Sequence, residues 1–181
     1  GAILFERDIN NDYVKFLGLG INAIERTESG VLGLITSSSY LDGKNFRGVR
    51  DALSHSSNSL RLLNLHGDSR SGALARQGIT DENVFDIETG VCILIADRHN
   101  GGVHCENFEY SEIVGTYAHK ALLLAEGDSS LVSTYHRIDP RRYKSFIPSK
   151  SLVLDEYSAF ATLDEGFGIA VDGIKTSRDG L

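Results

Sequence analysis

The sequence predicts an α/β fold, in which a mostly parallel sheet has helices on both faces and an antiparallel hairpin at one edge. The first observation is that apolar runs of strand length alternate with segments of helical periodicity in the first half of the chain, as in sheets built from strand–helix–strand units. The second is that two later apolar runs follow each other with only a polar loop between them, which is typical of an antiparallel pair. The third is the poor periodicity after Ser129, which predicts an irregular α+β extension.

The first predicted element is a helix over about residues 11–27. Residues that favour the N-cap position stand at its start, and apolar side chains then recur at helical spacing: Tyr13, Phe16, Leu17, Ile21 and Ile24. Gly18 and Gly20 each cost this helix about 1 kcal/mol relative to alanine, which suggests close packing on the face that carries them.

A strand, a loop and a second helix are expected next. Residues 31–36 form a short continuous apolar run, as in a strand covered on both faces. A turn-rich loop over 37–43 carries Tyr40 and leads into a helix of about 43–55. That helix is expected to bury Phe46, Val49 and Leu53 and to expose Arg47, Arg50 and Asp51.

The predicted antiparallel hairpin consists of a strand over 60–65, a loop over 66–83 and a strand over about 90–96. Beyond it, residues 103–110 are compatible with a further strand, and 115–126 with a short helix.

Composition narrows the function classes. The 181 residues carry a formal net charge of −7, which argues against binding nucleic acid mainly through the overall field but leaves room for a local basic groove. No apolar run approaches the roughly 20 residues that span a bilayer, and no basic-then-apolar leader is visible, so a cytoplasmic location is expected. Cys92 and Cys105 lack metal-ligand spacing and are expected to be reduced packing residues.

A search for a self-contained active site finds no dinucleotide loop, phosphate loop, HExxH or GxSxG motif. The histidines are scattered. His66, beside Asp68, is the most site-like of them, although a hydrogen bond that orders the loop is the favoured interpretation. The acidic pair Asp81-Glu82 could bind a metal, but a solvated loop is the favoured interpretation, and no metal is expected.

Two aromatic features keep alternatives open. Phe85 stands among polar neighbours in a loop just ahead of an apolar strand, so its ring is either a plug for the core or a platform for a flat ligand. Residues 135–150 combine tyrosines with cations, among them Arg141, Arg142 and Lys144. That composition suits phosphate backbones and stacked bases, and equally a solvated surface.

Several strings together resemble one family, the gamma-class, amino-group-directed adenine DNA methyltransferases. The resemblance is to the type ISP-like modules of large bacterial restriction–modification polypeptides that also carry helicase-like domains. The strings that carry it are NDYVKFLGLG (11–20), GVLGLITSSSYLDGKNFRGVRDAL (30–53), LRLLNLHGDS (60–69), DENVFDIETGVCILI (81–95) and GIKTSRD (173–179). They follow in the family's order, firmly to about residue 97 and again near the C-terminus.

The resemblance implies a partial Rossmann-like methyltransferase sheet, whose last strand is antiparallel, and S-adenosylmethionine as the cofactor of the intact enzyme. The family's glycine-containing cofactor loop and its Asn-Pro-Pro-Tyr-type catalytic tetrapeptide do not occur in this sequence, whose only prolines are Pro140 and Pro148. We therefore expect 1–98 to be the second half of a methyltransferase domain and 99–181 to be a linker and the start of a target-recognition region. The chain alone is expected to be inactive, with no catalytic residue of its own.

Residue roles follow from the same resemblance. Phe85 matches the aromatic that stacks on the extruded target adenine, and Phe16 matches an aromatic that packs on the cofactor's adenine, with core packing as the alternative for Phe16. Ser38, Ser39 and Tyr40 lie in the loop where α/β sheets place ligands. The residues expected near DNA are Arg141, Arg142, Lys144, Lys175, Thr176 and Arg178.

The partners implied are DNA and the remainder of the parent polypeptide or a complementary subunit. Removing neighbouring strands would expose an apolar edge at residues 31–36, so self-association is also expected. Two other classes of function stay open, a non-catalytic DNA-binding module and a subunit-docking module.

Overall fold

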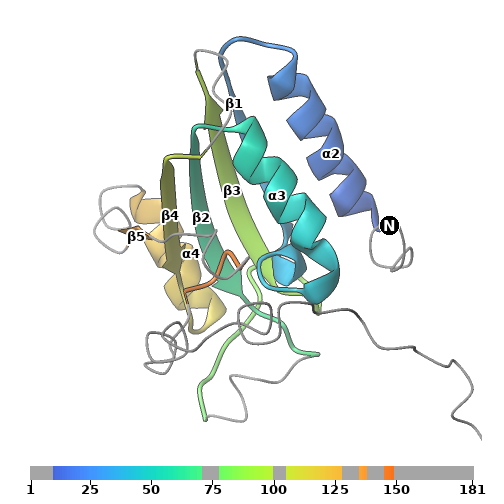
Figure 1. Cartoon of the computed structure of the whole chain (residues 1–181). Helices are drawn as coiled ribbons and strands as arrows, with labels where there is room; N and C mark the ends of the chain where they lie inside the picture. Colours follow the sequence, from blue (N-terminus) through green and yellow to red (C-terminus); the bar gives the residue numbers. More distant parts are fainter. Residues whose placement is uncertain (1–9, 71–77, 100–104, 128–134, 138–144, 149–181) are drawn as a thin grey trace, which may run out of the picture. The chain divides into compact units, whose positions relative to one another are not determined.

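In the described part of the chain, five strands form one mixed sheet in the order β1-β3-β2-β4-β5 (Figure 1). This is a computed structural model, and it describes residues 10–70, 78–99, 105–127, 135–137 and 145–148. The chain divides into two units, Gly1–Pro148 and Ser149–Leu181, and all described residues belong to the first. The mixed sheet with helices confirms an α/β fold.

Strand β3 (Val91–Arg98) lies between β1 (Gly30–Ser37) and β2 (Ser59–His66) and is antiparallel to both. Strands β1 and β2 therefore run in the same direction, as the alternation of strands and helices predicts. The prediction of a mostly parallel sheet is wrong for the described strands, because β3 lies between these two and only the β2–β4 ladder is parallel. The antiparallel pairing of β2 with β3 is confirmed, but its predicted place at an edge is wrong. Lateral order depends on contacts between distant segments, and local periodicity carries no information about it.

The sheet continues on the other side of β2. Strand β4 (Asn107–Glu112) pairs with β2 in parallel, and the short β5 (His136–Arg137) pairs with β4 antiparallel. The strand expected over 103–110 therefore exists, but it begins later, at Asn107, and runs further, to Glu112. Residues 107–112 thus join the sheet built by the earlier part of the chain.

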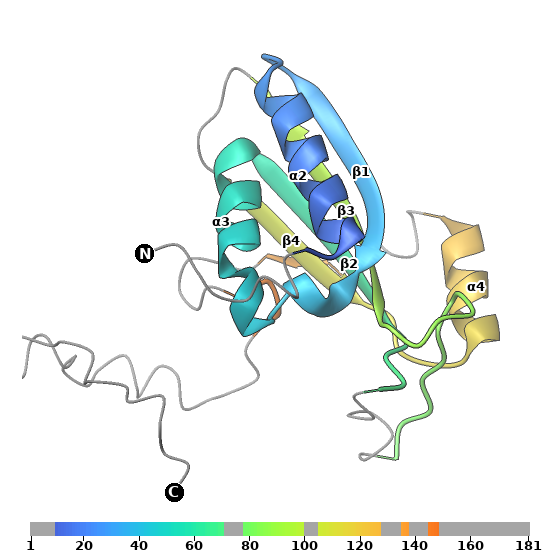
Figure 2. The same ribbon diagram turned by 90° about the vertical axis from the view of Figure 1, so that its right-hand side faces the viewer.

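Helices cover both faces (Figure 2). Helices α2 (Asp12–Glu25) and α3 (Arg47–Ser56) pack on one face, and α4 (Tyr117–Glu126) lies on the other. A 3-10 turn, η1 (Ser38–Tyr40), follows β1, and a second, η2 (Lys44–Phe46), leads into α3. The described helices agree with the predicted ones to within a few residues at their ends.

Helix α2 buries one stripe of apolar side chains: Val14, Leu17, Ile21 and Ile24. Close packing at Gly20 is confirmed, because a Cβ there would lie 2.7 Å from Leu32 Cδ1. Gly18 has open space around it, so the same expectation is wrong for that residue.

The larger core lies between the sheet and helices α2 and α3, with Leu60, Leu62, Leu94 and Phe108 among its members. A smaller core, which includes Leu63, Leu65, Val91 and Ile113, lies on the α4 side. Alternate residues of β2 thus serve opposite faces, as the pleat of a strand requires.

Arg50 departs from the prediction for α3. It was expected on the exposed face, but only 4% of it is exposed. Its guanidinium donates to the carbonyl oxygens of Tyr40, at 2.6 Å, and Gly43, at 2.9 Å. The stem of the arginine is thereby buried, and its head ties the loop after β1 to α3.

Cysteines form no disulfide with each other. Cys92 is buried and Cys105 is half-buried, which confirms the expectation of packing residues. Within the described ranges, no helix is both long enough and apolar enough to cross a membrane.

Candidate functional site

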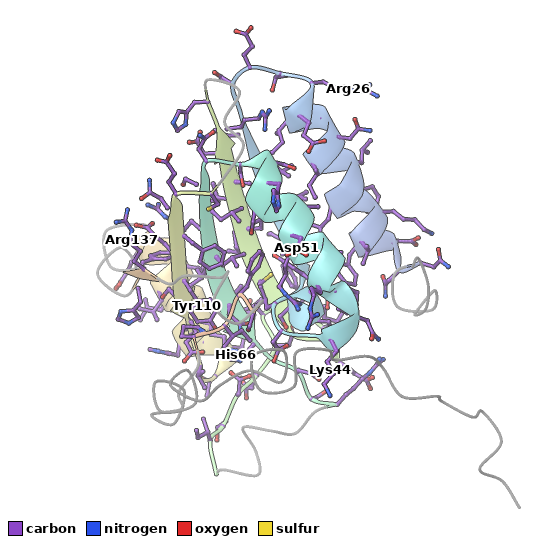
Figure 3. The ribbon with its side chains drawn as sticks, in the orientation of Figure 1. Arg26, Lys44, Asp51, His66, Tyr110 and Arg137 are labelled. Carbon is purple, nitrogen blue, oxygen red and sulfur yellow. The ribbon has the colours of Figure 1, made fainter. Side chains whose placement is uncertain are left out.

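The parallel strands β1, β2 and β4 end at the same edge of the sheet. Their last residues are Ser37, His66 and Glu112, and β3 begins at that edge with Val91, which pairs with both Ser37 and His66. In α/β sheets, ligands bind outside the carboxyl ends of parallel strands. The loops that leave this edge therefore form the candidate site, and Figure 3 shows His66 and Tyr110 near it.

A hydrogen-bonded network ties β2 to β4 at this edge. Asn64 Nδ2 donates to the Tyr110 hydroxyl at 3.1 Å, and that hydroxyl donates to Glu112 Oε2 at 3.1 Å. His66 Nε2 lies 3.0 Å from the same Glu112 oxygen. Burial raises the pKa of the Tyr110 phenol above its ordinary value of 10.0, so the phenol remains a neutral donor to Glu112.

His66 therefore orders this edge by pairing with Glu112 rather than with Asp68. Its backbone has a φ of +53°, in the left-handed region that costs a non-glycine residue about 1–2 kcal/mol. Its N–H donates to Asn64 Oδ1 at 3.0 Å, which helps to hold that conformation. The interpretation of His66 as a residue that orders the loop is the one the contacts support.

Gly67 is the point where the loop over 81–90 meets the end of β2. Its φ is +81°, and a Cβ on it would lie 2.5 Å from Asn83 Cα. Its N–H donates to Asp81 Oδ2 at 2.6 Å, and its carbonyl accepts from Asn83 Nδ2 at 3.0 Å. Only glycine fits here, because it adopts a positive φ freely and has no side chain to collide.

Asp81, at the start of this loop, has a buried side chain, whereas Glu82 beside it is exposed. The side chain of Asp81 is only 7% exposed, and Lys120 Nζ lies 2.6 Å from its Oδ1. Glu82 Oε2 accepts a hydrogen bond from the N–H of Tyr117, the first residue of α4, at 2.6 Å. The favoured solvated-loop interpretation is therefore wrong for Asp81, because a buried cation from a distant helix neutralises it. In the part of the chain that the structure describes, no group of three or more potential ligands could hold a metal ion.

Phe85 is held by its backbone while its ring projects from the loop. Its N–H donates to Asn83 Oδ1 at 2.9 Å, and its carbonyl accepts from the N–H of Ile87 at 2.9 Å. The residue is 49% exposed and belongs to neither core. Of the two alternatives for Phe85, the core plug is thus wrong.

Phe16 lies on α2, away from the buried stripe of that helix, and is 62% exposed. Core packing, the alternative for Phe16, is therefore wrong. Leu19, on the same helix, is 65% exposed, so the outer side of α2 offers apolar surface.

The three residues of the loop after β1 have different surroundings. Tyr40 is fully buried, and its hydroxyl accepts from Cys92 Sγ at 3.3 Å; burial raises the pKa of this phenol well above 10.0. Ser39 is exposed, and Ser38 is half-buried with its N–H bonded to the carbonyl of Gly90 at 2.8 Å. The structure thus joins the Ser38 loop to the end of the Phe85 loop, and it leaves the serines rather than Tyr40 accessible there.

The residues predicted to contact DNA all lie outside the described part of the chain: Arg141, Arg142, Lys144, Lys175, Thr176 and Arg178. Of the cluster over 135–150, the described part makes contacts within the protein. The guanidinium of Arg61 lies over the Tyr135 ring at 5.1 Å from its centroid, and Arg137 donates to Asn107 Oδ1.

Sequence reasoning missed Gly67, Asn83 and Lys120. The one signal for Gly67 was its place between a strand and a polar loop, which is ordinary for glycine. Lys120 stands beside an apolar run in a predicted helix, and lysines on helices are almost always exposed. Its burial could not be predicted without its partner.

Comparisons with known proteins show where this fold recurs. No family model matches the chain, and no curated protein matches its sequence. Among solved structures, the chain is similar to the ATP-dependent Type ISP restriction-modification enzyme LlaBIII bound to DNA, with 22% identity and a TM-score of 0.73 over 86% of this chain and 10% of that one.

Two further structures are similar. The DrdV–DNA complex has 16% identity and a TM-score of 0.67 over 83% of this chain and 14% of that one. A nuclease-deletion mutant of the Type ISP restriction-modification enzyme LlaGI, in complex with a DNA substrate mimic, has 22% identity and a TM-score of 0.64 over 80% of this chain and 14% of that one. At these identities the likeness is one of fold, and it covers a small part of much larger proteins.

Proposed function

We propose that this chain is part of a site-specific, adenine-N6 DNA methyltransferase of a restriction–modification system, and that it supplies the platform for the target base. The observation that carries the proposal is the half-exposed ring of Phe85, held on a hydrogen-bonded loop at the carboxyl-end edge of three parallel strands. The resemblance of the strings around Phe85 to adenine methyltransferases supports it. So does the similarity in fold to restriction–modification enzymes solved with DNA.

A platform is needed because the amine of adenine cannot be reached inside a duplex. Enzymes that modify a base must extrude it from the stack, at a cost of a few kcal/mol. A flat side chain that stacks on the extruded base returns roughly 1–3 kcal/mol. Phe85 offers such a ring, and the bonds of Asn83 hold its backbone.

S-adenosylmethionine, when bound to the intact enzyme, supplies the methyl group that is transferred to adenine N6. Phe16 fits a contact to the adenine ring of this cofactor, because its own ring is 62% exposed on the outer side of α2. The tetrapeptide that hydrogen-bonds the target amine does not occur in this sequence. The role of this chain is therefore to bind and orient, and the chain alone is expected to be inactive.

The DNA contacts proposed for the later part of the chain belong to the same function. Arginine and lysine at 141–144 and 175–178 would neutralise backbone phosphates, which fixes the register of a protein on a duplex without reading sequence. Ser38 and Ser39 lie in the loop whose Ser38 N–H bonds to the carbonyl of Gly90, at the end of the Phe85 loop.

Phe85→Ala in the complete polypeptide tests the platform. Losing about 1–3 kcal/mol of stacking lowers kcat/KM for methylation about 5- to 150-fold. Phe85→Tyr keeps a ring and should retain most of the activity. Leu122→Ala, which removes an apolar side chain that is 59% exposed on α4, is the matched control and should leave methylation unchanged.

The substrate offers a second control. A mismatched target adenine costs less to extrude, so a mismatch should raise the kcat/KM of the Phe85→Ala variant. A variant that methylates paired and mismatched sites equally well is not limited by holding the extruded base, and that result contradicts the stacking role.

The exposed edge at β1 supports a second role for this chain, which is docking to the remainder of the parent polypeptide or to a complementary subunit. Within the described residues β1 pairs with β3 alone. Val31 and Ile35 on β1 and Ile95 on β3 are 69%, 59% and 41% exposed. They project from the face of the sheet opposite to α2 and α3, because Leu32 and Leu34, their neighbours in the pleat, pack against the core on that side. The expectation that the strand over 31–36 is covered on both faces is therefore wrong.

A further inference from the structure

Helix α4 carries a lysine with no exposed side-chain surface. Lys120 Nζ lies 2.6 Å from Asp81 Oδ1, and it donates to the carbonyl oxygens of Leu65, at 2.6 Å, and Glu82, at 2.5 Å. An ammonium has three N–H donors, and these contacts supply an acceptor for each. Lysine is almost never fully buried unless it is paired. Lys120 thus joins the end of β2, the start of the Phe85 loop and α4 at one buried point.

Asp81 extends this junction. Its Oδ1 also accepts from the N–H of Gly115, at 3.1 Å, and its Oδ2 accepts from the N–H of Gly67, at 2.6 Å. The next residue adds two bonds, since the Glu82 N–H donates to the carbonyl of Gly115 at 2.9 Å and its carboxylate accepts from the N–H of Tyr117. The chain at 81–82 is therefore fixed to the turn before α4 as well as to β2.

The side-chain amide of Asn83 connects this junction to Phe85 through hydrogen bonds. Its amide nitrogen donates to the carbonyls of Gly67, at 3.0 Å, and Thr89, at 2.9 Å. Its amide oxygen accepts from the N–H of Phe85 at 2.9 Å. The bond from Asn83 to Thr89 closes the turn across its base, so the ring of Phe85 stands on a loop whose two ends are held together.

We propose that Lys120 and Asn83 are positioning residues that hold the Phe85 ring in its place before the target base arrives. This inference rests on the proposed function, in which Phe85 is the residue that stacks on the base. A loop that is already ordered loses little conformational freedom when a ligand binds, so more of the stacking free energy remains for holding the base. Lys120 lies in a helix outside the strings that resemble the methyltransferase family.

Replacing Lys120 with an uncharged residue would leave the buried Asp81 carboxylate without its counter-ion. Removing one partner of a buried ion pair leaves the other buried and uncompensated, which is much more costly than removing both. In Lys120→Met the Asp81 carboxylate would have to reach water, and the nearest route is movement of the loop that carries it. The Phe85 turn would move with that loop.

Hydrogen exchange of the 181-residue chain tests the mechanical part without any enzymatic activity. In Lys120→Met, the amides of Phe85 and Ile87 should exchange at least about tenfold faster than in the unchanged protein, because their acceptors lie in the loop that is released. The matched control is Lys15→Met, which removes a lysine that also pairs with an aspartate, Asp12 at 2.9 Å, but is 61% exposed. Equal protection of both amides in the two variants overturns the proposal.

A double-mutant cycle in the complete polypeptide tests the functional part. If Lys120 acts through Phe85, then Phe85→Ala should lower kcat/KM about 5- to 150-fold alone but at most about twofold in the Lys120→Met background. A purely structural effect of Lys120 would instead leave the Phe85→Ala factor unchanged, and that result overturns the inference. Should Lys120→Met fail to fold, the same cycle with Asn83→Ala replaces it, since Asn83 is half-buried and carries no charge.

The cycle also separates this inference from the proposed function. If Phe85→Ala alone leaves methylation unchanged, the platform role of Phe85 is wrong. If Phe85→Ala lowers methylation and its factor is the same in both backgrounds, the platform role stands and the positioning role of Lys120 and Asn83 is wrong.

Discussion

Gly67→Ala should lower the free energy of unfolding strongly, because Gly67 combines a positive φ with a close contact to the Asn83 backbone. The residue has a φ of +81°, and the added Cβ would lie 2.5 Å from Asn83 Cα, 2.9 Å from its Cβ and 3.0 Å from its Cγ. The left-handed conformation costs alanine about 1–2 kcal/mol. The collision is with backbone rather than with the far end of a flexible side chain, and overpacking of this kind costs typically 1–3 kcal/mol more. The expected loss of unfolding free energy is therefore about 2–5 kcal/mol.

Gly78→Ala is the matched control. Gly78 has a φ of +72°, but no atom of the described residues lies within 4 Å of its added Cβ, so Gly78→Ala should lower the unfolding free energy only by the conformational part, about 1–2 kcal/mol. Equilibrium unfolding in urea measures both variants, with the slope of the transition checked for constancy. A loss for Gly67→Ala no larger than that for Gly78→Ala would refute the close approach of β2 and the Phe85 loop.

The remaining predictions concern pH and association. Burial raises the pKa of Tyr110 above 10.0, so its contribution to stability is present below about pH 10 and is lost as the pH rises further; Tyr110→Phe should reduce the fall of the urea midpoint between about pH 10 and pH 12, and an undiminished fall would contradict this. The chain should self-associate through β1, because Ile35 is 59% exposed beside an edge that pairs on one side among the described residues; sedimentation should show less association for Ile35→Lys than for the control Leu122→Lys, and monomers throughout would count against it.

Local periodicity predicts these elements because the residues that each element buries recur with that element's own period. In α2 the buried stripe from Val14 to Ile24 follows the helical repeat directly, and in β2 the apolar run is dense because alternate residues enter two cores. Such patterns depend only on neighbours in sequence. They place a helix or strand to within a few residues, but they do not predict its contacts with distant parts of the chain.

What could not be predicted depends on distant partners. Arg50 was expected in solvent because arginine usually is, yet two carbonyl oxygens in the loop after β1 accept from it. The sequence favours a solvated Asp81 and gives no sign that Lys120 is buried, because each residue is buried only through its pairing with the other. The candidate site was located through Phe85 by its contrast with polar neighbours, whereas the residues that hold Phe85 carry no such contrast.

The place of β3 has a consequence for how the protein folds. Because β3 lies between β1 and β2, those two strands have no partner in each other. Gly30 pairs with Arg98 at one end of the β1–β3 ladder, so most of the described sheet cannot close until the chain is made as far as residue 98. Until then β1 and β2 have no antiparallel partner on the nascent chain and are exposed to aggregation. Strand β3, which pairs with both, is the last of the three to be synthesised.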